Sequence, residues 1–331
     1  MVNYVILLCI VIFKLKSFNK MDVVDLRGRG LTSLPDWVVT CPHIRKLLLD
    51  NNKLTSLPPE IGNLSSLRFL SISNNKLTSL PPEIGKLHNL GTLCLNNNCL
   101  EIIPDTINNL KQLDSFDVYN NKLTSLPKMD RLSNLKTIGA SLNRISEFDI
   151  GDTLYSLNDL YMNNNNLTTF PLGMCKLANL KVVSLCSNQI SSLPGEIGML
   201  YHLRWLSLGD NQLSSLPDEF ESLTQLKTLG LSNNLFTTFP TVVLELKQLQ
   251  CLGLDNNYLT SIPPHIENLR HLKLSLKNNP LMTPQVQKST DQYINTKKQP
   301  TTTSKSFTER LLAYIYKSGT DPIPNEIELF R

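Results

Sequence analysis

The stretch NNKLTSLPPEIG occurs twice in this chain, at residues 51–62 and again at residues 74–85. An identical repetition of this length indicates that the chain is built from copies of one unit, so a fixed period is expected. Asparagine recurs at intervals of 23 residues, with three intervals of 22 residues that end at Asn143, Asn165 and Asn279. The recurring residues are Asn52, Asn75, Asn98, Asn121, Asn143, Asn165, Asn188, Asn211, Asn234, Asn257 and Asn279.

Each of these asparagines lies within the pattern L-x-x-L-x-L-x-x-N-x-L, as in LRFLSISNNKL at 67–77 and LRWLSLGDNQL at 203–213. One more copy, MDVVDLRGRGL at 21–31, precedes them and carries Arg29 in place of asparagine. Twelve copies at this regular spacing are typical of a leucine-rich repeat array, whose period is about 20–29 residues.

The alternating leucines explain why such a unit repeats. Leucines two residues apart point to one face of a short strand, and the residues between them point to the other. No unit can bury its leucines alone, so the strands stack in parallel, and each buried aliphatic side chain contributes about 1.5–3 kcal/mol. The sequence therefore predicts an α/β leucine-rich-repeat solenoid, a curved horseshoe of twelve repeats. Its concave side is a parallel sheet, and its convex side is irregular or short-helical.

The residues that recur have structural roles in this fold. The amide of each recurring asparagine is expected to form hydrogen bonds with backbone groups of the turn that leaves the strand. The proline of LPPEIG fixes φ and directs the chain to the convex side, and the glycine allows a tight backbone path. The stretch NNKLTSLPPEIG is therefore interpreted as structural, and function is sought in the residues that vary.

The repeat is irregular near the middle of the chain. The convex segments LPKMDRLSN (126–134) and FDIGDTLYS (148–156) depart from LPPEIG, and two of the shortened intervals fall there. Ala140 replaces a core leucine, and Gly139 leaves its concave position without a side chain. Tolerated drift and a local change of curvature both explain this departure.

Composition and motifs argue against catalysis, metal binding and nucleic-acid binding by this chain. The 32 basic and 28 acidic side chains are dispersed and leave a formal charge of only +4, which does not favour nucleic acid as a partner. The seven cysteines are odd in number and contain no CxxC pair, which favours reduced thiols in a cytosolic protein. The five histidines do not pair at metal-ligand spacing, and RGRG (27–30) lacks the features of a phosphate loop. We therefore predict no catalytic residue, no metal, no cofactor and no enzymatic activity.

The two ends of the chain depart from the repeat. Residues 1–20 contain the apolar run VNYVILLCIVIF, which is too short to span a bilayer and is followed by lysines. This segment is a cap, an upstream extension or a signal. Residues 21–284 form the repeat domain, 285–298 are predicted to be a capping helix and 299–306 a linker. The short helical tail, 307–331, either folds back as a second cap or carries a partner-binding segment.

The form L-x-x-L-P-x-x-I-G-x-L resembles the intracellular leucine-rich-repeat proteins of the Ras-group type, over about residues 21–285. These include the plant Ras-group family, the scaffold of the Sur/Shoc type, and the repeat domains of erbin and scribble. The resemblance implies a cytoplasmic, non-enzymatic scaffold in signal transduction, with a small GTPase or a phosphatase as partner by analogy only. The alternative is a secreted or membrane-anchored recognition receptor.

The variable strand positions carry the predicted binding surface. They contain the aromatic residues Phe69, Tyr119, Tyr161 and Trp205, which we predict to form a row of roughly 29 Å on the concave face. Acidic residues accompany them, namely Asp117, Asp159, Asp210 and Asp255, and a basic edge contains Lys53, Lys76, Lys122 and Arg144. A surface of this length fits a protein partner rather than a small-molecule substrate, and a membrane surface is not favoured. The competing explanation is that aromatic residues favour strands and that the charges keep the sheet soluble.

Overall fold

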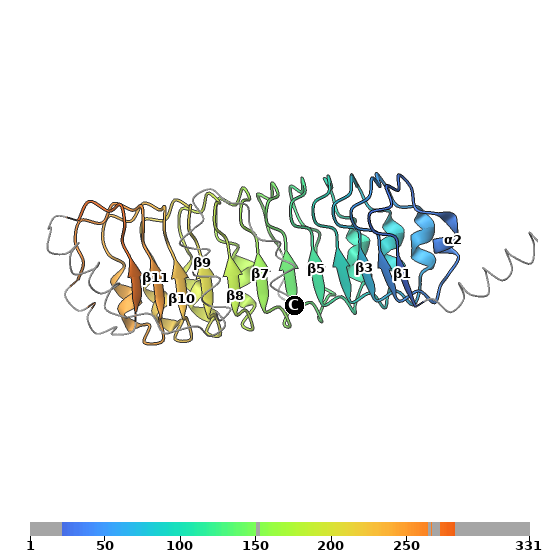
Figure 1. Ribbon diagram of the computed structural model, residues 1–331. Helices are drawn as coiled ribbons and strands as arrows, with labels where there is room; N and C mark the ends of the chain where they lie inside the picture. The colour runs from blue at the N-terminus through green and yellow to red at the C-terminus, as the bar shows by residue number, and fades with distance from the viewer. Residues whose placement is uncertain (1–21, 150–152, 264–265, 267–271, 282–331) are drawn as a thin grey trace, which may run out of the picture.

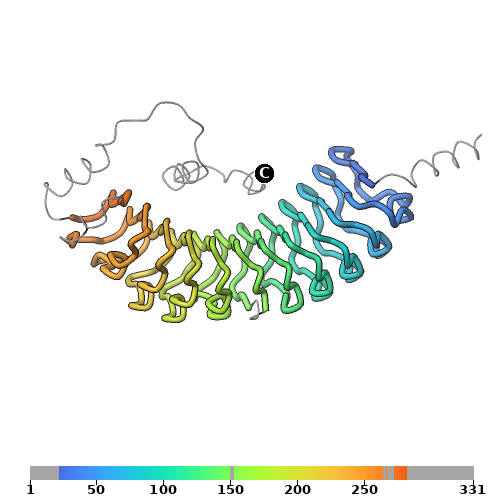
Figure 2. The backbone as a smooth tube through the Cα atoms, turned by 90° about the horizontal axis from the view of Figure 1, so that it is seen from below, coloured from blue at the N-terminus to red at the C-terminus, as the bar shows by residue number. Residues whose placement is uncertain are grey.

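The structure is a computed structural model, and it describes residues 22–149, 153–263, 266 and 272–281. Within these residues, twelve parallel strands form one sheet in which spatial order follows chain order (Figure 1). Each strand has three residues, and the tube through the Cα atoms curves into a crescent (Figure 2). The strands are β1 Val23–Asp25, β2 Lys46–Leu48, β3 Phe69–Ser71, β4 Thr92–Cys94, β5 Ser115–Asp117, β6 Thr137–Gly139, β7 Asp159–Tyr161, β8 Val182–Ser184, β9 Trp205–Ser207, β10 Thr228–Gly230, β11 Cys251–Gly253 and β12 Lys273–Ser275.

The convex side of most described repeats carries a short helical turn that follows a proline. One is a four-residue α-helix, α2 (Asp36–Val39), and the others are 3-10 helices. These are η1 Pro59–Asn63, η2 Pro82–Lys86, η3 Asp105–Asn109, η4 Leu172–Lys176, η5 Gly195–Met199, η6 Asp218–Ser222 and η7 Thr241–Glu245. The predicted solenoid, with its parallel sheet and short-helical convex side, is confirmed.

The core lies between the sheet and the convex turns. The middle residue of a strand points into it, as Leu70, Leu93 and Phe116 do, each with no exposed surface. Isoleucines of the convex turns, such as Ile61 and Ile84, close the core from the other side. Because each repeat supplies the same set of side chains, the core continues along the array and is not divided into domains.

The glycine of PEIG is required by packing between successive convex turns. A Cβ added at Gly62 would lie 2.8 Å from the backbone oxygen of Glu83. One added at Gly85 would lie 2.4 Å from the backbone oxygen of Thr106. Neither glycine has a positive φ, so the predicted tight path is confirmed, and its cause is the close approach of the next repeat.

The recurring asparagines form a continuous ladder of hydrogen bonds between repeats. The Oδ1 of Asn121 accepts a hydrogen bond from the N–H of Leu100 at 2.9 Å. Its Nδ2 donates to the carbonyl oxygens of Leu95 and Val118, both at 3.0 Å. The same arrangement occurs at all eleven predicted asparagines, which are buried. The predicted asparagine ladder is confirmed.

The residue before each ladder asparagine has a left-handed backbone. Asn51 and Asn74 have φ of 59° and 55°, and the corresponding residues of the later repeats have φ between 51° and 57°. Asparagine adopts this conformation more readily than most residues, which explains the doubled asparagine of NNKLTSLPPEIG. Leu142 occupies the same position with a φ of 54°, at a cost of roughly 1–2 kcal/mol.

The irregular middle of the chain keeps the register of the sheet. Ser115 pairs with Thr137, and Thr137 pairs with Asp159, without a break. The residues 126–134 contain no 3-10 helix, and Met129 is buried there. The shortened interval between β5 and β6 is therefore absorbed on the convex side.

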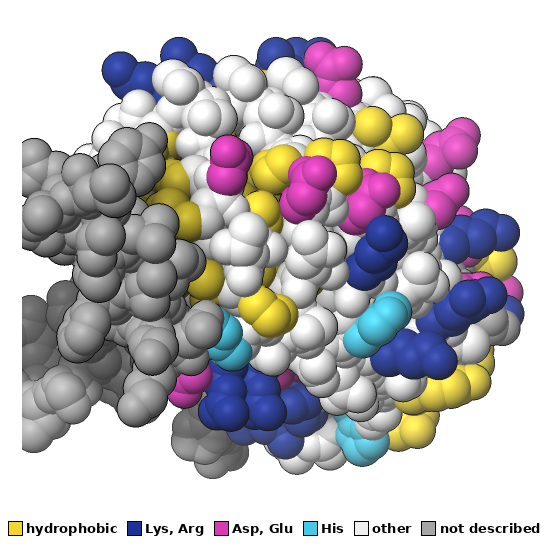
Figure 3. Space-filling view, turned by 90° about the vertical axis from the view of Figure 1, so that its right-hand side faces the viewer, with side chains coloured by type: hydrophobic (Ala, Val, Ile, Leu, Met, Phe, Trp, Pro, Cys, Tyr) yellow, Lys and Arg dark blue, Asp and Glu magenta, His cyan; other side chains and the backbone are white. Residues whose placement is uncertain are grey.

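The end of the sheet at β1 presents hydrophobic side chains among charged ones (Figure 3). Val23, at the start of β1, is 49% exposed. The segments predicted at 1–20, 285–298, 299–306 and 307–331 lie outside the described residues. Within the described ranges, no helix combines the length and apolarity needed to cross a bilayer.

The ladder can be tested with Asn165→Ala. The amide of Asn165 bonds the N–H of Ile145 at 2.9 Å and the carbonyl oxygen of Ala140 at 3.0 Å. Its loss leaves buried backbone groups unpaired, so we expect the free energy of unfolding to fall by about 1–3 kcal/mol. Urea unfolding followed by circular dichroism measures this. The control is Asn166→Ala at an exposed position, and equal unfolding midpoints for the two variants would contradict the role of the ladder.

The concave floor as a candidate binding site

The concave floor is made by the first and third residues of the strands. The third residues form one row across the sheet, because each strand pairs with the next in strict register. This third-residue row consists of Asp25, Leu48, Ser71, Cys94, Asp117, Gly139, Tyr161, Ser184, Ser207, Gly230, Gly253 and Ser275. The core does not require particular side chains at these positions. They can therefore differ between repeats and are free to contact a partner.

The predicted aromatic row is wrong as a single row. Phe69 and Trp205 are first residues of β3 and β9, whereas Tyr161 is the third residue of β7. Tyr119 lies two residues beyond the end of β5 and is only 9% exposed. The pattern was misread because residues two apart share a face but not a row. The Lys46 Nζ lies 4.7 Å from the centroid of the Phe69 ring, so this ring also contributes to the sheet by a cation–π contact.

The four acidic residues occupy different environments. Asp117 is the third residue of β5 and Asp159 the first residue of β7, and burial raises the pKa of both carboxyls. For Asp159, the nearby Lys181 opposes this pKa shift. Asp210 is exposed and has a left-handed φ of 54°, so it has a turn role. The carboxylate of Asp255 accepts hydrogen bonds from the Ser275 hydroxyl and from a backbone N–H of the last repeat.

Asp117 has the most strongly perturbed carboxyl of the floor. Its side chain is 8% exposed, and this burial raises its pKa to about 6. The N–H of Tyr119 donates to its Oδ1 at 2.9 Å, which opposes the shift only in part. The neighbouring Cys94 has a pKa raised to about 12 by burial and by the charges of Asp117 and Asp50. The Cys94 thiol is therefore neutral at physiological pH.

The predicted basic edge lies just beyond the asparagine ladder. All four of its side chains are exposed, and they belong to repeats in the first half of the array. These residues are Lys53, Lys76, Lys122 and Arg144. The exposed residues at the same position in later repeats include Leu235 and Tyr258, which are 45% and 56% exposed. The edge therefore changes from basic to uncharged along the array, because Asn166, Gln189 and Gln212 occupy this position between the basic residues and Leu235.

Small residues on the floor were not predicted. From β8 to β12, every member of the third-residue row is serine or glycine. A Cβ at Gly230 would lie 3.1 Å from the Ser207 Oγ, so the rows pack tightly here. A row without large side chains allows the backbone of a partner to approach closely. The signal was present in the sequence, because the x of L-x-L is serine or glycine in five successive repeats.

The described residues hold no group of three or more histidine, cysteine, aspartate or glutamate side chains that could bind a metal ion. The three histidines that the structure describes, His43, His88 and His202, lie before strands and not on the concave floor.

Comparisons with known proteins identify the family. The family model for a leucine-rich repeat region matches residues 5–161 and 179–290, which is more than half of the chain. The chain belongs to the leucine-rich repeat proteins. Leucine-rich repeat domains generally act as protein-binding scaffolds and are typically non-enzymatic. A comparison with curated protein sequences finds no match.

Solved structures share the fold. An internalin, InlF of Listeria monocytogenes, is 22% identical with a TM-score of 0.65, over 83% of this chain and 86% of that chain. The leucine-rich repeat domain of APL1B is 23% identical with a TM-score of 0.68, over 82% and 80%. These two likenesses show the fold alone. A chain of the PEPR1–AtPEP1 structure is 28% identical with a TM-score of 0.60, over 79% of this chain but 42% of that chain.

None of these three structures is a protein of the Ras-group type. The resemblance to that subclass therefore stays a prediction from the repeat pattern. The partner classes that it implies, a small GTPase or a phosphatase, stay predictions as well.

The burial of Asp117 predicts a pH dependence of stability. Its pKa of about 6 in the folded chain lies above the usual value of about 3.9, so the folded state binds this proton more tightly than the unfolded state. Stability is therefore expected to fall as pH rises from about 4 to about 6, and to change little from this group above that range. Asp117→Asn keeps the Oδ1 acceptor, removes this dependence and raises the free energy of unfolding at pH 7 by about 2–3 kcal/mol.

Urea unfolding at several pH values measures this effect. Asp218→Asn, an exposed carboxyl of η6, is the matched control and should leave the pH profile unchanged. A parallel pH profile for the Asp117→Asn variant and the wild type would contradict the assignment.

Proposed function

We propose that this protein is a non-enzymatic scaffold that binds a protein partner on the concave floor, in intracellular signal transduction. The observation that supports it best is the placement of Tyr161 and Trp205. Both are partly exposed on the floor, on β7 and β9, although their strand positions place no demand on the core. Tyrosine and tryptophan are favoured anchors at protein interfaces.

The surroundings of these two anchors support contact with an extended partner. Beyond β7, the third-residue row has only serine and glycine, so a partner backbone can lie close to the sheet beside Trp205. The exposed basic edge of the first repeats lies along the same array and favours an acidic region on the partner. A chain of the PEPR1–AtPEP1 structure shares this fold, and its combination with a second molecule there is compatible with this proposal.

The proposal is tested with the double substitution Tyr161→Ala and Trp205→Ala. Affinity purification from cell lysate with mass spectrometry identifies the proteins recovered by the wild-type chain. The double variant is expected to recover the specific partner at least about tenfold less, because two anchor side chains are removed. The control is Tyr155→Ala with Tyr201→Ala, tyrosines that are 64% and 50% exposed outside the strands. Equal recovery by an intact double variant would rule out the concave floor.

The alternative function is a secreted or membrane-anchored recognition receptor. The likeness to the structure of a TDR receptor, which is 26% identical with a TM-score of 0.62, favours keeping it as the second candidate. Expression of the full chain in eukaryotic cells distinguishes the two. The intracellular proposal predicts an uncleaved N-terminus and no glycan at Asn63 or Asn166, the exposed asparagines of the NLS and NLT sequons. Cleavage near residue 20 together with a glycan at either asparagine would favour the receptor.

A further inference from the structure

Two aspartates occupy the same position in different repeats. Asp25 is the third residue of β1, and Asp117 is the third residue of β5. Each carboxylate accepts a hydrogen bond from the N–H two residues later, at 3.1 Å from Arg27 and at 2.9 Å from Tyr119. The two repeats therefore present a carboxylate at the same position and in the same turn geometry. They differ in the residue two positions later, which is Arg27 in the first repeat and Tyr119 in the fifth.

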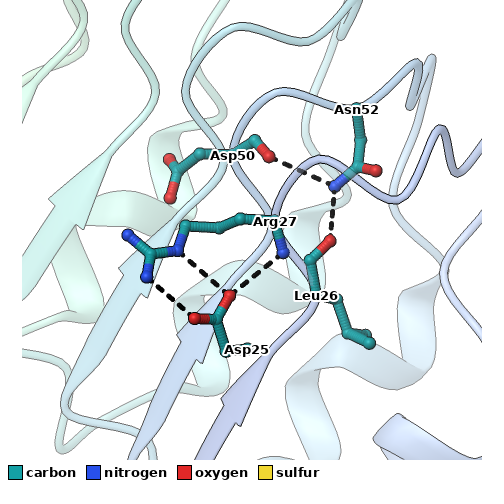
Figure 4. A network of polar contacts seen from close by, with 5 residues as sticks. All are labelled: Asp25, Leu26, Arg27, Asp50 and Asn52. Carbon is teal, nitrogen blue, oxygen red and sulfur yellow. Dashed lines mark hydrogen bonds and ion pairs between the residues drawn. The ribbon is translucent and has the colours of Figure 1, made fainter.

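In the first repeat, Arg27 satisfies the carboxylate. Its Nε donates to the Oδ1 of Asp25 at 3.0 Å, and its Nη2 donates to the Oδ2 at 2.8 Å (Figure 4). This two-pronged contact is the geometry in which a guanidinium recognises a carboxylate most strongly. It holds the pKa of Asp25 at about 2. The first repeat thus shows that a carboxylate at the third strand position can bind a guanidinium.

In the fifth repeat, the position of Arg27 is taken by Tyr119. Among the described residues, no cation opposes the charge of Asp117, whose pKa reflects burial and one backbone hydrogen bond. Asp117 is nevertheless more buried than Asp25, with 8% of its surface exposed. A buried carboxylate without a counter-charge is unfavourable in the unbound chain, and a bound cation would relieve it.

Asp117 lies on the concave side of the sheet, where the partner is proposed to bind. β5 lies near the middle of the twelve described strands (Figure 1). Its register partners in the third-residue row are Cys94 on β4 and Gly139 on β6. Gly139 has no side chain to cover the carboxylate, and Tyr161 follows on β7. One of the proposed anchors therefore lies two strands from the carboxylate, within reach of a single peptide segment.

We propose that Asp117 receives the guanidinium of an arginine side chain of the partner, which pairs with it as Arg27 pairs with Asp25. This inference rests on the proposed function and gives the chemistry of its partner, a segment with an arginine near an apolar or aromatic residue. The charge of Asp117 is not needed by the fold, because an amide in its place would still accept the Tyr119 N–H.

The test uses the full chain as the target of a phage-displayed random-peptide library. Selection on the wild type is expected to enrich arginine-containing peptides. The best peptide should bind Asp117→Asn at least about tenfold more weakly, as the loss of a charge-assisted hydrogen bond implies. Replacing the peptide arginine with citrulline should have the same effect. Binding to the wild type should also weaken between about pH 7 and pH 5, as Asp117 gains a proton.

Two further variants make the result specific. Asp218→Asn, an exposed carboxyl on the convex side, should leave the affinity unchanged. Tyr119→Arg supplies an internal guanidinium at the position of Arg27, so it should compete with the peptide and weaken binding. Circular dichroism confirms that each variant is folded before binding is compared.

Three outcomes would overturn the inference. Selected peptides without arginine enrichment, or with equal affinity for Asp117→Asn, contradict it. If such peptides still lose binding to the variant with Tyr161→Ala and Trp205→Ala, the proposed concave-face function survives and only the arginine site fails. A library that yields no binder, or binders indifferent to all these variants, contradicts both.

Discussion

The buried asparagine amide is the interaction on which the rest of this structure depends. Each amide bonds a backbone N–H of the preceding repeat and carbonyl oxygens of both repeats, as Asn121 does with Leu100, Leu95 and Val118. These backbone groups lie where three-residue strands end and no sheet ladder reaches them. Without the amide, they would be buried and unpaired at every turn of the array. A strand of only three residues can therefore be part of a stable sheet.

The ladder also separates structural from functional residues. The leucine, asparagine, proline and glycine of each repeat provide the packing and hydrogen bonds that hold successive repeats together. The first and third residues of each strand can therefore vary without affecting the core. This freedom allows an unusual carboxylate at Asp117 and partly exposed aromatic residues at Tyr161 and Trp205. The fold tolerates these residues because the stabilising free energy of the many buried leucines and amides exceeds the destabilising free energy at a few floor positions.

The sequence predicted the fold and the ladder because both depend on period alone. Leucine spacing identifies the face of each strand, and asparagine spacing identifies the repeats. Other features depend on neighbouring repeats and were not predicted. The burial of Tyr119 and the contact of the Gly62 position with Glu83 arise only when the repeats stack. The chemical difference between Asp25 and Asp117 depends on such neighbours too, since the two have the same place in the pattern.

The central claim is that recurring residues stabilise the stack and that varying floor residues do not. A substitution scan of one repeat, read out as protease resistance of the displayed chain, tests it most directly. In the seventh repeat, substitutions at Leu160 and Asn165 are predicted to abolish protease resistance. The Leu160 side chain is packed in the core, and the buried Asn165 amide forms hydrogen bonds with the preceding repeat. Substitutions at Asp159 and Tyr161 are predicted to leave protease resistance almost unchanged. Equal sensitivity at the floor and ladder positions would contradict the account.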